Sequence, residues 1–207
     1  ACMAMAVPPN SSGVRGERPL SRREGHKLLT LVLFVKSGGG DSSRNSHSPR
    51  VLLGRKKRGF GQGFYNGFGG KVEASDASIL TAAAREMKEE SGLVPTDLAL
   101  KGVLTFIWDD AEAEQSSPNA QPWDVHVYKC TECEGDVVET DEMAPVWMDV
   151  DKVPELYDGR MWEDDQHWHP LFFADKLFRG TFHFEKTTVL KHFTLEEVSE
   201  IHDTLSS

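Results

Sequence analysis

Apolar residues occur in short runs or alternate with polar residues at six places along the chain, and each place predicts a β-strand. The first is the continuous run Leu28 to Val35, which is typical of a strand buried on both faces of a sheet. The predicted strands span residues 27–36, 51–53, 98–108, 122–130, 146–150 and 181–185.

Helical spacing appears between these strands. An Ala- and Glu-rich segment predicts a helix over 77–91 that ends at Gly92, since glycine readily adopts the left-handed conformation found at helix ends. Weaker patterns predict helices at 153–157, 170–178 and 195–205. Strands and helices are mixed in one unit, so we expect a single α/β domain over residues 27–207.

Two segments lack the apolar residues that a core requires. Residues 1–26 are small and polar, and we expect a disordered tail. Their four arginines also resemble those of a transit peptide, but two acids and the lack of an apolar face favour the tail. Residues 37–49 are rich in Gly and Ser and predict a flexible loop inserted between the first two strands.

Composition and charge restrict the partners. The chain of 207 residues has 23 basic and 33 acidic side chains, a net charge of −10, and 39% hydrophobic residues. No apolar run approaches the roughly 18 residues of a membrane span. The negative balance disfavours tight, non-specific binding to nucleic acid. It is compatible with a small phosphorylated ligand that binds together with a divalent cation, because the cation supplies the positive charge. We also expect the protein to be a monomer.

Three cysteines are too few for a disulfide scaffold and indicate a reducing compartment. Cys130 and Cys133 have the spacing of a metal-binding pair, but no second pair follows, so two ordinary thiols near a strand end are the favoured interpretation. His167 and His169 are a weaker candidate metal pair, and we expect His183 and His192 to be structural.

The predicted helix over 77–91 carries the most informative residues. Glu86, Glu89 and Glu90 fall within an arc of about 100° on the helical wheel. Like charges at this spacing repel one another, whereas a hard cation such as Mg²⁺ or Mn²⁺ would join them. A solvated acidic face is the alternative. The preceding Gly-rich stretch 66–72 favours the cation site, because its backbone N–H groups are accessible to a phosphate.

Residues 70–93 resemble the Nudix box, in which Gly, five residues, Glu and seven residues precede Arg-Glu-apolar-x-Glu-Glu-x-Gly-apolar. The second half matches at every fixed position. In the first half, Asp76 replaces the Glu, and one extra residue precedes Arg85. The resemblance implies an α/β/α sandwich with a mixed, curved sheet. It also implies a metal site for Mg²⁺, with Mn²⁺ as a second possibility, formed by Glu86, Glu89, Glu90, Glu142 and Gly70.

Most of residues 28–198 also resemble the branch of this family that hydrolyses oxidised purine nucleoside triphosphates. The resemblance implies that Asn66, Asp164 and Asp165 hydrogen-bond the purine and that Trp162 stacks on it. It places the other substrate-binding residues in the same pocket or near the triphosphate: Lys56, Phe60, Phe106, Met143 and Trp168. An exposed acidic turn at 163–165 is the alternative. Two adjacent aspartates in an apolar pocket cannot easily ionise together, so one can donate a hydrogen bond while the other accepts.

The expected reaction is therefore Mg²⁺-dependent hydrolysis of a nucleotide such as 8-oxo-dGTP or 2-hydroxy-dATP to the monophosphate and pyrophosphate, with Glu86, Glu89 and Glu90 as the catalytic residues. The alternatives are hydrolysis of another nucleotide (a dinucleoside polyphosphate, a nucleotide sugar or an alkylated purine triphosphate) and a Nudix-fold module that senses nucleotide without cleaving it. Cleansing of the nucleotide pool would take place mainly in the cytosol, with the mitochondrial or nuclear pool as alternatives.

Overall fold

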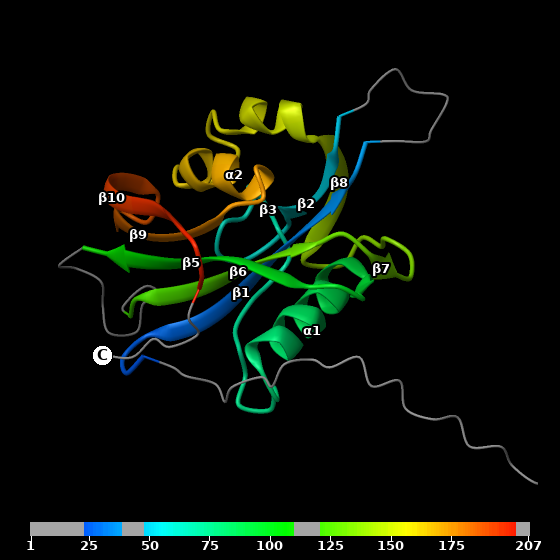
Figure 1. Ribbon diagram of the computed structural model, residues 1–207, viewed down its shortest axis with the longest axis horizontal. Helices are drawn as coiled ribbons and strands as arrows, with labels where there is room; N and C mark the ends of the chain where they lie inside the picture. Colours follow the sequence, from blue (N-terminus) through cyan, green and yellow to red (C-terminus); the bar gives the residue numbers. More distant parts are fainter. Residues whose placement is uncertain (1–22, 39–47, 110–120, 202–207) are drawn as a thin grey trace, which may run out of the picture.

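A mixed sheet of eight strands runs through the centre of the molecule in the computed structural model, which describes residues 23–38, 48–109 and 121–201 (Figure 1). Its strand order is β10-β9-β5-β6-β1-β2-β3, and β8 pairs along the whole of β2. β1 runs parallel to β6 and β5 runs parallel to β9, whereas the other pairs are antiparallel. The strands are β1 (Lys27–Lys36), β2 (Arg50–Lys56), β3 (Tyr65–Asn66), β5 (Ala99–Trp108), β6 (Trp123–Cys130), β8 (Met143–Asp149), β9 (Leu177–Glu185) and β10 (Val189–Val198).

Helices cover the two faces of this sheet (Figure 1). α1 (Ile79–Ser91) packs on one face, and the 3₁₀ helix η1 (Val150–Leu156) and α2 (Asp165–Phe173) lie on the other. Each face has its own apolar core, one that includes Val32, Phe68 and Met87 beneath α1 and one built around the large aromatic side chains next to α2. The layers form an α/β/α sandwich, which confirms the expected fold. β4 (Val94–Pro95), which follows α1, pairs with β7 (Cys133–Glu134), which follows β6, in a separate two-stranded antiparallel sheet.

The ends of α1 are fixed by its own sequence. The Ser78 hydroxyl accepts the backbone N–H of Thr81 at 3.1 Å and caps the first turn. Gly92, at φ 79°, donates its N–H to the Lys88 carbonyl and ends the helix. The predicted helix is therefore confirmed, and its glutamates are held on a rigid element.

The C-terminal part of the chain differs from the prediction. α2 begins at Asp165 rather than at residue 170, and it ends before Asp175, whose φ of 62° is incompatible with a helix. The predicted helix at 195–205 is wrong over its described part, because β10 continues to Val198 and residues 199–201 are not helical; residues 202–205 lie outside the described residues. Pairing with β10 satisfies the backbone groups along the edge of β9, and this contact between distant residues outweighs the local helical pattern.

The ordered domain begins before residue 27. The Arg23 guanidinium donates to the buried Asp124 carboxylate and to the Thr105 hydroxyl, so residue 23, which the sequence assigns to the tail, contacts the sheet. Most of the predicted tail and most of the 37–49 loop lie outside the described residues. Among the helices that the structure describes, none is long and apolar enough to cross a membrane.

Candidate active site

A cavity of about 620 Å³ opens between the sheet, the loop 59–64 and the segment 162–168. One end is acidic and the other is aromatic, and both are needed to hold a ligand with a charged part and a flat part. The polar residues that line the cavity are Lys27, Thr30, Lys56, Asn66, Lys71, Glu86, Glu90, Glu142, Asp164 and Asp165. The aromatic residues that line it are Phe60, Phe64, Phe106, Trp108, Trp123, Trp162, Trp168 and Phe184.

Glu86 and Glu90 on α1, together with Glu142 just before β8, form the acidic end. The side chains of Glu86 and Glu90 are only 15% and 6% exposed, and burial raises the pKa of both carboxyl groups. Lys56 bridges two of the acids, with Nζ 3.1 Å from Glu90 Oε1 and 2.7 Å from Glu142 Oε1. A positive charge therefore fits between these carboxylates, and hard oxygen donors are the ligands that Mg²⁺ and Mn²⁺ prefer.

Arg85 connects the acidic end to the loop that precedes α1. Its Nε and Nη2 donate to the two oxygens of Asp76 at 3.0 and 2.9 Å, and these bonds lower the pKa of the Asp76 carboxyl group. Its Nη1 donates to Glu86 at 2.9 Å and to Glu89 at 3.2 Å. Asp76 thus anchors Arg85 despite the additional residue between them, and Arg85 in turn orients Glu86.

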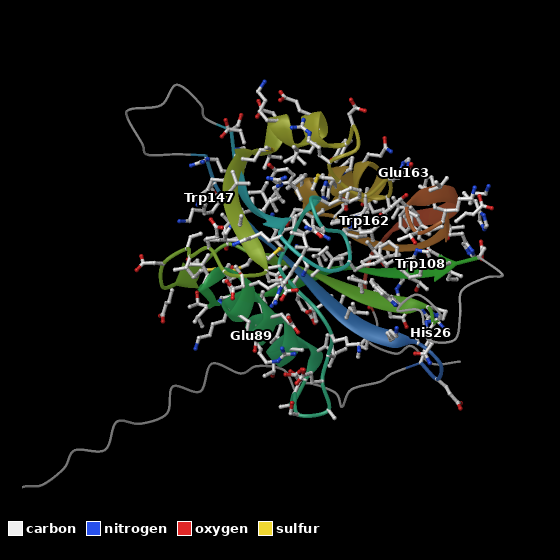
Figure 2. The ribbon with its side chains drawn as sticks, turned by 180° about the vertical axis from the view of Figure 1, so that it is seen from behind. His26, Glu89, Trp108, Trp147, Trp162 and Glu163 are labelled. Carbon is white, nitrogen blue, oxygen red and sulfur yellow. The ribbon has the colours of Figure 1, made fainter. Side chains whose placement is uncertain are left out.

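Glu89 and Gly70 have different surroundings from the other predicted metal ligands. The Glu89 side chain is 57% exposed, does not line the cavity, and lies on α1 away from Trp162 (Figure 2). Gly70 lines the cavity, and a Cβ atom built there would lie 2.6 Å from Glu86 Oε2, so any larger residue at this position would displace the Glu86 carboxylate. The Gly70 carbonyl accepts the Thr30 N–H at 2.9 Å and keeps one lone pair for another partner.

Asp164 and Asp165 lie at the other end of the cavity, at the start of α2. Asp164 accepts the Trp168 indole N–H at 2.9 Å, and Asp165 accepts the backbone N–H of Trp162 at 3.0 Å. Both aspartates are buried, which raises the pKa of each, and the charge of Asp164 raises that of Asp165 further. The pair is therefore buried in the cavity wall, which is incompatible with an exposed acidic turn. The hydrogen bond from Trp168 thus holds the Asp164 carboxylate in place.

The aromatic side chains form a stacked wall. Phe60 lies parallel to Trp162, with ring centroids 4.9 Å apart and an interplanar angle of 17°, and Phe64 meets Trp162 edge-on at 5.0 Å. Gly61 allows this approach, because a Cβ atom there would lie 3.0 Å from the Trp162 ring. Trp162 and its neighbours thus provide a flat surface of the size of a purine.

The remaining predicted substrate residues also line the cavity: Lys56, Asn66, Phe106 and Met143. Asn66 Oδ1 accepts the Gly67 N–H at 2.8 Å, which leaves the Nδ2 amino group as the donor that it can offer a ligand. Sequence reasoning missed Trp108, whose ring meets that of Trp123 edge-on at 4.9 Å. Strand alternation contained the signal, since Trp108 is two residues after Phe106 and therefore faces the same side of the sheet.

The family model described as the NUDIX domain matches residues 43–172, more than half of the chain. The chain belongs to the Nudix family. It is 41% identical to the oxidized purine nucleoside triphosphate hydrolase of Danio rerio over 175 residues, which cover 84% of this chain and 97% of the relative. The hydrolase of the same name from Mus musculus is 39% identical over 172 residues, covering 83% and 96%.

The Nudix fold is also found by structural comparison. The crystal structure of the mMutator MutT protein from Bacillus halodurans superposes with a TM-score of 0.65 at 27% identity, covering 82% of this chain and 97% of that one. The MutT protein from Methanosarcina mazei Go1 has a TM-score of 0.50 at 21% identity and supports the fold alone. In all of these comparisons the match extends over most of this chain.

The histidine and cysteine pairs noted in the sequence have local partners. Buried His169 contacts the Tyr157 hydroxyl at 3.0 Å, and burial lowers its pKa to about 3. His167 stacks on Phe193 instead, with ring centroids 4.3 Å apart, so these two histidines point apart as expected. Cys130 and Cys133 are free thiols whose sulfur atoms lie 3.3 Å apart.

Proposed function

We propose that this protein hydrolyses oxidised purine nucleoside triphosphates to the monophosphate and pyrophosphate. The observation that carries the proposal is that one cavity joins an acidic cluster to a buried aspartate pair beside a Trp surface. The relatives in Danio rerio and Mus musculus, which match nearly their whole length, are named as hydrolases of this substrate class. The combination favours an enzyme over a module that only senses nucleotide.

The triphosphate would bind at the acidic end. Glu86, Glu90 and Glu142 would hold Mg²⁺, or Mn²⁺, with Glu89 and the Gly70 carbonyl as additional ligands. When bound, the cation would neutralise phosphate charge and lower the pKa of the attacking water. Arg85 keeps Glu86 in position, and Lys56 is close enough to the acidic residues to pair with a phosphate oxygen. One of these glutamates would take up the proton of the water.

The base would bind at the aromatic end. Trp162 offers one face of a purine a stacking surface, a contact worth about 1–3 kcal/mol. The aspartate pair, with one proton shared between its members, can donate one hydrogen bond and accept another along the purine edge. Oxidation at C8 turns N7 into a donor on the Hoogsteen edge, and oxidation at C2 changes the donors and acceptors of the Watson–Crick edge. The pair is therefore suited to distinguishing an oxidised purine from the parent base.

A panel of nucleotides assayed for pyrophosphate release, with and without Mg²⁺, tests the proposal. We expect kcat/KM for 8-oxo-dGTP or 2-hydroxy-dATP to exceed that for dGTP or dATP, and we expect no release without a divalent cation. Higher activity on an alkylated purine triphosphate, a dinucleoside polyphosphate or a nucleotide sugar would replace the proposed substrate. Tight binding without turnover would indicate a sensor.

The metal-binding roles have a separate test. Glu86→Gln and Glu89→Gln should retain the fold, measured by circular dichroism, and lose turnover. Survival of turnover in either variant would remove that residue from the catalytic set.

We further propose that the enzyme acts as a monomer, without nucleic acid or membrane partners. It would act on the cytosolic nucleotide pool, where it would prevent incorporation of oxidised bases into DNA. Sedimentation of the purified chain and fractionation of cells that express it test these points.

A further inference from the structure

A second group of metal-ligating side chains lies outside the nucleotide cavity. Asp109, His183 and His192 each offer a ligand atom, and these atoms all lie within 4.8 Å of one another. His183 is flanked on β9 by Phe182 and Phe184, which are buried in the core next to α2. Because side chains alternate across a strand, His183 projects from the opposite face of the sheet. The group is thus separated from the cavity by the sheet.

The pairing of β9 with β10 brings the two histidines together. Leu190 lies opposite Phe184, and uninterrupted pairing would place Lys191 opposite His183. The register instead shifts between Leu190 and His192, so that His192 becomes the partner of His183. A bulge of this kind re-aims side chains at a sheet edge. Here the bulge places the imidazole of His192, rather than the ammonium group of Lys191, opposite His183.

The distances within the group suit a transition metal. The His183 Nδ1 atom lies 3.1 and 3.2 Å from the two carboxylate oxygens of Asp109. Metal–ligand bonds of about 2.0–2.2 Å in a tetrahedral zinc site place neighbouring ligand atoms about 3.3–3.6 Å apart. The His192 ring lies 4.0 Å from the His183 ring, centroid to centroid. A ligand nitrogen of His192 already lies within 4.8 Å of the ligand atoms of the other two residues, and the His192 side chain is exposed rather than held by packing.

The donor set also separates this group from the acidic end of the cavity. Two imidazoles and one carboxylate favour Zn²⁺ and the late first-row metals, whereas carboxylates alone favour Mg²⁺ or Mn²⁺. The side chains of His183 and Asp109 are 24% and 46% exposed, so an ion can enter from solvent and a water molecule can complete its coordination.

We propose that Asp109, His183 and His192 form a binding site for one Zn²⁺ ion, or a similar late first-row divalent cation, that ties the end of β5 to the β9–β10 hairpin. Trp108 precedes Asp109 and lines the nucleotide cavity, and its indole N–H donates to the Thr187 carbonyl in the same hairpin at 3.2 Å. The ion would therefore fix the hairpin on which this part of the cavity wall rests. Binding to the folded state alone would also stabilise the protein.

Equilibrium dialysis of the full chain against Zn²⁺, with saturating Mg²⁺ to occupy the acidic cluster, tests the proposal. We expect the wild type to bind one Zn²⁺ ion and to gain thermal stability from it. His192→Gln and Asp109→Asn should each weaken Zn²⁺ binding by about tenfold or more. His167→Gln is the matched control, because His167 stacks on β10 but lies outside the group.

A second readout locates the ion. The ring proton resonances of His183 and His192 should shift on addition of Zn²⁺, and those of His167 should not. Wild-type affinity in both His192→Gln and Asp109→Asn, or no Zn²⁺ bound to the wild type, would overturn the proposal. Loss of the ion in Cys133→Ser would also overturn it, by assigning the zinc to the thiol pair. None of these three results would bear on the proposed hydrolysis, which is measured with Mg²⁺ alone.

Discussion

Replacement of Asp164 by Asn is the most direct test of how the cavity recognises a base. The change preserves the size of the side chain and keeps an oxygen that can accept the Trp168 indole N–H, now at 2.9 Å. It replaces the second carboxylate oxygen with an NH₂ group that can only donate. The variant therefore loses one acceptor at the purine edge and retains its packing.

The expected loss follows from the burial of this carboxyl group. Asp164 is 4% exposed, so a hydrogen bond that it makes to the base is shielded from water. A hydrogen bond to a charged group is worth about 1.5–3 kcal/mol, which corresponds to a loss of about 10- to 100-fold in kcat/KM. The loss should apply to 8-oxo-dGTP and should be smaller for dGTP, since the acidic end of the cavity is unchanged.

Stability should change in the opposite direction. Burial raises the pKa of Asp164 above its unfolded value of 3.8, so the folded state binds more protons than the unfolded state above that pH. The wild type therefore loses stability as pH rises from the unfolded pKa through the folded one, and Asn avoids this loss because it does not titrate. Urea unfolding should show Asp164→Asn to be at least as stable as the wild type at neutral pH, and its relative stability should fall in acid.

Pyrophosphate release gives kcat/KM for both nucleotides. Glu163→Gln is the matched control: it is the same acid-to-amide change on the neighbouring residue, which is exposed and whose Oε2 accepts the Leu190 N–H at 2.7 Å. The control should retain the preference for 8-oxo-dGTP. Equal losses on 8-oxo-dGTP and dGTP in Asp164→Asn, or an unchanged preference, would refute the assigned role in base recognition.

Three further substitutions test the acidic end. Glu90→Gln removes a carboxylate that is nearly buried in the cavity, and it should fold but release no pyrophosphate; retained turnover would contradict the metal assignment. Gly70→Ala introduces a Cβ atom 2.6 Å from Glu86 Oε2, so kcat should fall while circular dichroism stays unchanged. Arg85→Lys loses the two-pronged contact with Asp76 and should lower the urea-derived free energy of unfolding by about 1–3 kcal/mol; an unchanged value would show that this contact adds no stability.

The local sequence by itself determined the conformation of β1 and of α1, the helix that carries the glutamates. The run over 27–36 forms β1, and the helix that carries the glutamates starts at Ser78 and stops at Gly92 because the signals at both ends lie within a few residues. The box motif identified the family for the same reason, since its spacing places the acids on one face of a single helix. In these segments periodicity and end signals agree, and no distant contact opposes them.

Only the tertiary structure decided which acids share a cavity. Glu86 and Glu89 are three residues apart, yet the first lines the cavity and the second is exposed, because the position of α1 against the loop before it sets how far the cavity extends around the helix. The pairing of His183 with His192 likewise depends on a register shift between two strands. β10 forms because its backbone pairs with the free edge of β9. The local sequence of β10 contains no information about the unpaired N–H and C=O groups on β9, so it could not predict this strand.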